Sequence, residues 1–173
     1  MVDFRGEPFE EPGHQDFVTE EIHPVAENRE HTNSVDALSA NPTNRAIYAS
    51  GSHDYNIKLW DGNSGQCIKT MRGHQGGVWH MNYMNDGRKI ISASVDGTAK
   101  IWDTNNGQCI DTLQGVHDFK VYNVAVNDAM TQACTVGGSD KKIVLWDLRN
   151  TRQPLLVNTD SQSSVISCDF SND

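Results

Sequence analysis

Serine, histidine and aspartate are the residue types of a nucleophilic triad, and the sequence places them near one another as His74, Ser92 and Asp96. In such a triad the aspartate orients the histidine, which takes the proton of the serine hydroxyl. A nucleophile also needs an exposed oxygen, an oxyanion hole and a cleft. A set that recurs along the chain, with its serine inside an expected strand, supplies none of these. We therefore expect a structural role for these residues and no catalysis.

The set belongs to a repeated phrase that ends in Trp-Asp. Its tryptophans, Trp60, Trp102 and Trp146, are 42 and 44 residues apart. Each ends an alternating run, IKLWD, AKIWD or IVLWD, which is typical of a strand. A turn that contains an aspartate precedes each run, and another β-rich run precedes the turn, so each phrase predicts two strands joined by a tight turn. Periods of roughly 40–45 residues that end in Trp-Asp are typical of four-stranded blades.

A histidine marks the start of each repeat, and a valine follows it by four residues. The histidines are His31, His74 and His117, and the valines are Val35, Val78 and Val121. A fourth start, SQSSVISCDF, has Val165 at the valine position and Ser161 at the histidine position.

These features resemble the WD40-repeat, or β-transducin repeat, family over about residues 17–173. The resemblance implies an all-β fold: a partial WD40 β-propeller with three complete four-stranded antiparallel blades and the start of a fourth. We expect the blades at about 35–71, 78–113 and 121–157, a partial blade at 165–170, and a leading outer strand from Phe17 to Ile22. Residues 1–16 are expected to form an acidic, flexible arm.

The resemblance also implies a hydrogen-bond chain in each blade, which joins a loop histidine, a strand serine or threonine, a turn aspartate and the tryptophan. Carried over to this sequence, the sets are His31, Ser50, Asp54 and Trp60; His74, Ser92, Asp96 and Trp102; and His117, Asp140 and Trp146. In the third set Val136 stands at the serine position. We therefore expect an incomplete chain there, and a smaller loss of stability from Asp140→Ala than from Asp96→Ala.

Charge and composition narrow the ligand class. The chain has 173 residues and a net charge of −9, and residues 1–34 hold nine acidic and two basic side chains. Such acidity argues against nucleic acid as a direct ligand, because phosphate neutralisation needs clustered Lys and Arg. No run is apolar enough for a membrane helix, and the N-terminus lacks the pattern of a secretory signal. The four cysteines form no CxxC pair, and no phosphate-binding, HExxH or EF-hand motif occurs, so we expect no metal and no cofactor.

The expected function is a non-enzymatic scaffold for protein–protein interactions in a multiprotein complex, cytoplasmic or nuclear. Candidate partner contacts are Tyr55, Trp79 and Phe119. One alternative is a substrate receptor for cullin-4-type ubiquitin ligases, because Trp146-Asp147-Leu148-Arg149 resembles the Trp-Asp-x-Arg signature of such receptors. Another is a structural subunit of a ciliary, ribonucleoprotein or trafficking assembly. Closed propellers have about 4–8 blades, so the remaining blades are expected from further sequence or from another chain.

Overall fold

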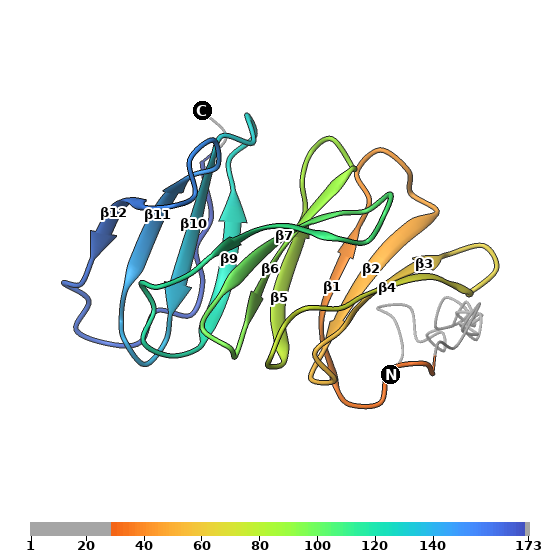
Figure 1. Cartoon of the computed structure of the whole chain (residues 1–173), viewed down its shortest axis with the longest axis horizontal. Coiled ribbons are helices and arrows are strands. Elements are labelled where there is room, and N and C mark those ends of the chain that lie inside the picture. Colours follow the sequence, from red (N-terminus) through yellow and green to blue (C-terminus); the bar gives the residue numbers. More distant parts are fainter. Residues whose placement is uncertain (1–28, 172–173) are drawn as a thin grey trace, which may run out of the picture.

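The computed structural model describes residues 29–171, and these form twelve β-strands (Figure 1). Blade 1 contains β1 (Val35–Ala40), β2 (Ile47–Ser52), β3 (Ile57–Asp61) and β4 (Cys67–Met71). Blade 2 contains β5 (Val78–Tyr83), β6 (Lys89–Ser94), β7 (Ala99–Asp103) and β8 (Cys109–Leu113). Blade 3 contains β9 (Val121–Val126), β10 (Gln132–Gly137), β11 (Ile143–Asp147) and β12 (Pro154–Asn158). The expected acidic arm and leading strand lie outside the described residues.

Each blade is a meander in which every strand pairs antiparallel with its neighbour in sequence. The first strands of the three blades, β1, β5 and β9, lie side by side (Figure 1). The fourth strand of each blade is the edge strand farthest from its first strand. The prediction of three four-stranded antiparallel blades is therefore confirmed.

The connections divide the ends of the blades into two faces. We call one end the His-loop face; it is formed by loops 31–34, 72–77 and 114–120 and turns 53–56, 95–98 and 138–142. The other end carries the turns that join first to second strands and third to fourth strands. Tight turns occur at both ends of the blades, and aspartate or asparagine side chains accept backbone N–H groups within them. Asp61, for example, accepts from the backbone N–H of Asn63 at 2.8 Å.

The core lies between the blades, because strand alternation gives each sheet two faces and each inner face is covered by a neighbour. One cluster joins blades 1 and 2, and includes Leu59, Met81 and Trp102. The other joins blades 2 and 3, and includes Ile101 and Trp146. In both clusters the repeat tryptophan points toward the blade that precedes its own.

Equivalent positions on the first strands show what this stacking covers. Leu38, Met81 and Val124 pair with Ser50, Ser92 and Thr135 and so point toward the preceding blade. Met81 is 1% exposed and Val124 is fully buried, whereas Leu38 is 70% exposed. No blade precedes blade 1 among residues 29–171, so its outward face presents apolar surface to solvent.

The prediction of a lone inner strand from Val165 to Phe170 is wrong for the described structure, since these residues form no strand. The first strand of a blade forms its ladder with the second strand of the same blade. Residues 29–171 contain no second strand of a fourth blade. The segment nevertheless lies against blade 3: Cys168 Sγ is 3.4 Å from the carbonyl oxygen of Cys134. Residues 165–170 thus lie beside blade 3 without forming a strand ladder.

Candidate functional site: blade networks and the His-loop face

Blade 2 holds a hydrogen-bond network that runs from its third strand to the His-loop face. Trp102 Nε1 donates to Ser92 Oγ at 2.8 Å. His74 lies between Ser92 and Asp96, with Nε2 2.8 Å from the serine oxygen and Nδ1 2.8 Å from the carboxylate. Asp96 also accepts from the backbone N–H of Gln75 at 2.9 Å. The network thereby ties loop 72–77 to strands β6 and β7.

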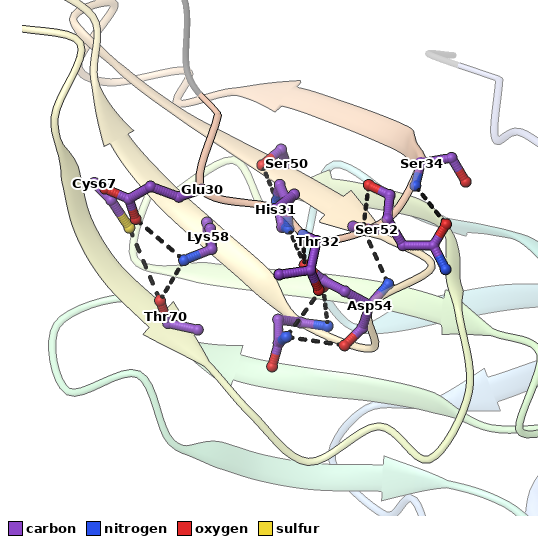
Figure 2. Close-up of polar contacts among 12 residues, drawn as sticks. Glu30, His31, Thr32, Ser34, Ser50, Ser52, Asp54, Lys58, Cys67 and Thr70 are labelled. Atoms are coloured by element: carbon purple, nitrogen blue, oxygen red, sulfur yellow. Dashed lines mark hydrogen bonds and ion pairs between the residues drawn. The ribbon is translucent and has the colours of Figure 1, made fainter.

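Blade 1 repeats this geometry. Figure 2 shows His31 between Ser50 and Asp54, with both contacts at 2.7 Å. Trp60 Nε1 donates to Ser50 Oγ at 2.7 Å, and Asp54 accepts from the backbone N–H of Thr32 at 3.0 Å. The same residue types at the same spacing therefore give the same contacts in the first two blades.

Blade 3 also has a complete network, and the expectation that Val136 interrupts it is wrong. Thr135 Oγ1 accepts from Trp146 Nε1 at 2.9 Å and lies 2.9 Å from His117 Nε2. His117 Nδ1 lies 2.9 Å from Asp140. Val136 is fully buried on the opposite face of β10, because successive strand residues alternate.

The cause is one additional residue in the hairpin between β10 and β11. Asp96 follows Ser92 by four positions, whereas Asp140 follows Thr135 by five. The distance from aspartate to tryptophan is the same in all three repeats, so counting back from Trp146 selects Val136 in place of Thr135. The longer turn is visible in the ladder, where Gly137 N–H donates to Lys142 O at 3.0 Å.

One proton arrangement satisfies every polar atom of the blade 2 network. The neutral imidazole of His74 donates from Nδ1 to Asp96 and accepts at Nε2 from Ser92, which itself accepts from Trp102. Burial lowers the pKa of His74, and the attraction of Asp96 does not offset it. Burial opposes ionisation of Asp96, but donors that include His74 outweigh it and hold the pKa below its usual range. The pair is therefore a neutral histidine beside a carboxylate.

The pKa values of the blade 3 histidine and of the aspartates in blades 1 and 3 are shifted in the same directions. Burial lowers the pKa of His117, with Asp140 opposing this effect. Burial acts to raise the pKa of Asp54, but hydrogen bonds from His31, Thr32 and Asn56 bring it to about 2. Each aspartate is thus ionised at neutral pH and fixed by donors from the loop that it holds.

The buried setting explains why these residues do not form a nucleophilic site. Ser92 has no exposed surface, and its oxygen already has two partners, Trp102 and His74. A substrate carbonyl could not approach that oxygen without opening the sheet. Among residues 29–171, moreover, no group of three or more acidic, histidine or cysteine side chains could hold a metal ion.

Two of the candidate contact residues are exposed on the His-loop face. Phe119 is 60% exposed and Tyr55 is 51% exposed. Tyr55 also has a φ of 73°, in the left-handed region that a bulky residue rarely adopts. The equivalent turn position of blade 2 is Gly97, with a φ of 81°, and glycine adopts this conformation without strain. The turn therefore holds a strained tyrosine in solvent where a glycine would fit.

Trp79 lies half-buried at the start of β5, in a row of rings that continues this face. Its ring centroid is 5.3 Å from that of His53 and 5.4 Å from that of Tyr122. Lys120 Nζ lies 5.8 Å from the same ring centroid, within range of a cation–π contact. The indole Nε1 is buried and has no hydrogen-bond partner in the described part of the chain. The ammonium group of the exposed Lys120 thus lies over the ring of the half-buried Trp79.

The last candidate residue, Arg149, lies in the loop between β11 and β12. Its guanidinium makes a bidentate pair with Asp147, at 2.8 and 2.7 Å, and its side chain is 74% exposed. An exposed pair of this kind contributes little to stability. It does hold the Arg149 side chain in one orientation at the surface.

No helix long and apolar enough to cross a membrane occurs in the described range.

Comparison with known proteins agrees with the repeat geometry. The WD domain, G-beta repeat family matches residues 22–61, 65–103 and 107–147. The coronin-like protein crn1 of Schizosaccharomyces pombe is 28% identical over 79% of this chain and 23% of its own length. Autophagy-related protein 16 of Arabidopsis thaliana is 31% identical over 80% of this chain and 27% of its own length.

A third relative is the U5 small nuclear ribonucleoprotein 40 kDa protein of Dictyostelium discoideum, 30% identical over 59% of this chain and 28% of its own length. The chain spans less than a third of the length of each of these proteins. Each of the three family matches ends with the third strand of a blade, at Asp61, Asp103 or Asp147, and each blade has its own His–Ser/Thr–Asp–Trp network. These matches show that the chain belongs to the WD40 repeat family.

Proposed function

We propose that this chain is a non-enzymatic protein-interaction scaffold whose partners bind at the His-loop face. The observation that carries the proposal is Tyr55, a large aromatic side chain kept exposed in a strained left-handed turn. Strain of this kind persists only where the surrounding structure imposes it, and it is concentrated at functional sites. Phe119, which is also exposed on the His-loop face, adds a second aromatic side chain, a residue type enriched at protein interfaces.

The rigidity of this face supports the same function. His31, His74 and His117 each fasten a loop to its blade through an ionised aspartate. Loops on a rigid frame are where binding residues are usually found. The similarity to a U5 small nuclear ribonucleoprotein 40 kDa protein is consistent with a place in a multiprotein complex. We place the protein in the cytoplasm or nucleus, since its four cysteines are free thiols.

The experiment is affinity purification of the full protein from its own cells, with quantitative mass spectrometry. Phe119→Ala is compared with Asn63→Ala, because Asn63 is exposed at the opposite end of the blades. The proposal expects Phe119→Ala to lose bound proteins that Asn63→Ala retains, while both variants melt like the wild type. Equal recovery of every partner by the two variants would contradict it.

A second part of the proposal is that further blades complete the ring, supplied by other sequence or by another chain. The support is Leu38, 70% exposed at a position where Met81 and Val124 are buried by a preceding blade. At the other end of the stack, Leu156 of β12 is 59% exposed. Repeat units bury such faces only against neighbours. Cross-linking mass spectrometry of the native assembly tests this, and the absence of any cross-link to either outward face would contradict it.

The exposed, oriented guanidinium of Arg149 favours a second candidate function, as a substrate receptor for cullin-4-type ubiquitin ligases. The test is a pull-down with the ligase adaptor, comparing wild type with Arg149→Ala and with Arg152→Ala as the matched control. Retention by the wild type and by Arg152→Ala, with loss in Arg149→Ala, would support this role. No adaptor in the wild-type lane would end it.

A further inference from the structure

Two cysteines, Cys134 and Cys168, meet on the outward face of blade 3. Cys134 lies in β10 and Cys168 in the segment that follows β12, and both are half-buried. The thiol of Cys168 lies 3.4 Å from the carbonyl oxygen of Cys134 and 3.5 Å from Oδ1 of Asn123. Interaction with the Cys168 side chain lowers the pKa of the Cys134 thiol. The two cysteine side chains therefore lie against each other.

The repeat explains why these side chains face each other. Cys134 precedes Thr135 as Ile91 precedes Ser92, and Cys168 follows Val165 as Val124 follows Val121. Ile91 and Val124 are both fully buried in the cluster that joins blades 2 and 3. The thiol pair thus occupies a position where a core contact joins one blade to the next.

We propose that Cys134 and Cys168 form a reversible disulfide that staples residues 159–171 to blade 3 when the protein meets a peroxide. Residues 159–171 form no strand ladder in the described structure, so a covalent link would replace the missing tether. The polar contacts that join the segment to the blade include one from Lys141 Nζ to the Gln162 carbonyl oxygen, at 3.1 Å. The proposal does not depend on partner binding at the His-loop face.

The chemistry needs two thiols and one peroxide molecule. The Cys134 thiolate attacks the peroxide, so that an S–O bond forms, the O–O bond breaks and water leaves after protonation. The Cys168 sulfur then attacks the Cys134 sulfenic acid, an S–S bond forms, and a second water leaves with the thiol proton. The thiol pair loses two electrons in total and the peroxide gains them. The interaction with the Cys168 side chain lowers the pKa of Cys134, which suits Cys134 for the first step.

The test treats the full, reduced chain with hydrogen peroxide, alkylates the remaining thiols and maps the peptides by mass spectrometry. We expect a Cys134–Cys168 linked peptide in the monomer, lost on addition of dithiothreitol, with Cys67 and Cys109 alkylated. Cys168→Ser is expected to abolish the link and to leave a sulfenic acid on Cys134 that dimedone traps. Cys67→Ser is the matched control and is expected to form the link as the wild type does.

Hydrogen exchange tests the staple itself. Amides of residues 159–171 should exchange more slowly in the oxidised wild type than in the reduced protein, and Cys168→Ser should show no such difference. Oxidation of Cys134 without a linked peptide, or a link formed only between two chains, would overturn the proposal. A linked peptide with unchanged exchange of residues 159–171 would overturn the stapling role.

Discussion

Thr135 accepts the indole N–H of Trp146 at 2.9 Å, and this contact completes the third blade network. The threonine does what Ser50 and Ser92 do for Trp60 and Trp102 in the other blades. The three blades are therefore fastened alike, although blade 3 carries a longer hairpin.

Replacing the Thr135 hydroxyl should destabilise the chain. Thr135→Val keeps the shape but leaves the buried nitrogens of His117 and Trp146 without a partner, at a cost of about 1–3 kcal/mol. Thr135→Ser keeps the hydroxyl and is the matched control, with a smaller expected loss. The free energy of unfolding from urea titration measures both. Equal stabilities of the two variants would show that the hydroxyl does not matter.

Removing the turn aspartate should cost about the same in blades 2 and 3. Asp96→Ala and Asp140→Ala each remove the acceptor of a buried histidine and of backbone N–H groups, and we expect a loss of roughly 1–3 kcal/mol for each. Asp160→Ala, at an exposed position outside the blades, serves as control and should change little. A clearly smaller loss for Asp140→Ala would restore the view that the third network is incomplete.

Acid should destabilise the fold in two steps. Burial lowers the pKa of His74 and His117, so the unfolded chain binds protons first, and stability should fall as the pH drops below about 6.5. The pKa of Asp54 is about 2 in the fold against a usual 3.8, so its contribution is complete above that usual value and is lost as the pH falls toward 2. Urea titrations at a series of pH values measure both steps. Constant stability from neutral pH to pH 5 would contradict the neutral, buried histidines.

The fold could be predicted further than the site. The Trp-Asp period and the His-to-Val spacing predicted where the first strands begin. Both patterns include residues, the repeat histidine and tryptophan, whose side chains make the hydrogen bonds of the blade networks. The assignment of Val136 failed because counting back from Trp146 assumes hairpins of equal length. A shift of one residue along a strand selects a side chain on the opposite face of the sheet. The exposure of Tyr55 in a left-handed turn could not be predicted either, since the Asp-Gly turn at Asp96 signals that conformation but Asp54-Tyr55 does not.

The outward position of Leu38 gives a contrast between equivalent residues. Leu38→Glu should change the stability of this chain by no more than about 0.5 kcal/mol, as for other exposed sites. Met81→Ala, at the equivalent buried position of blade 2, should cost about 2–5 kcal/mol. Chemical denaturation compares the two variants. Unfolding of the chain by Leu38→Glu would mean that the outward face of blade 1 is already covered.

The most direct test of a partner-binding His-loop face is Tyr55→Gly. Glycine relieves the left-handed strain, as Gly97 does in blade 2, so we expect the variant to be as stable as the wild type or more stable by up to about 1 kcal/mol. The measurement pairs the melting temperature with the amount of each partner recovered in affinity purification. Our account predicts lost partner recovery from a protein that melts at the same or a higher temperature. Full recovery of every partner by this variant would contradict it.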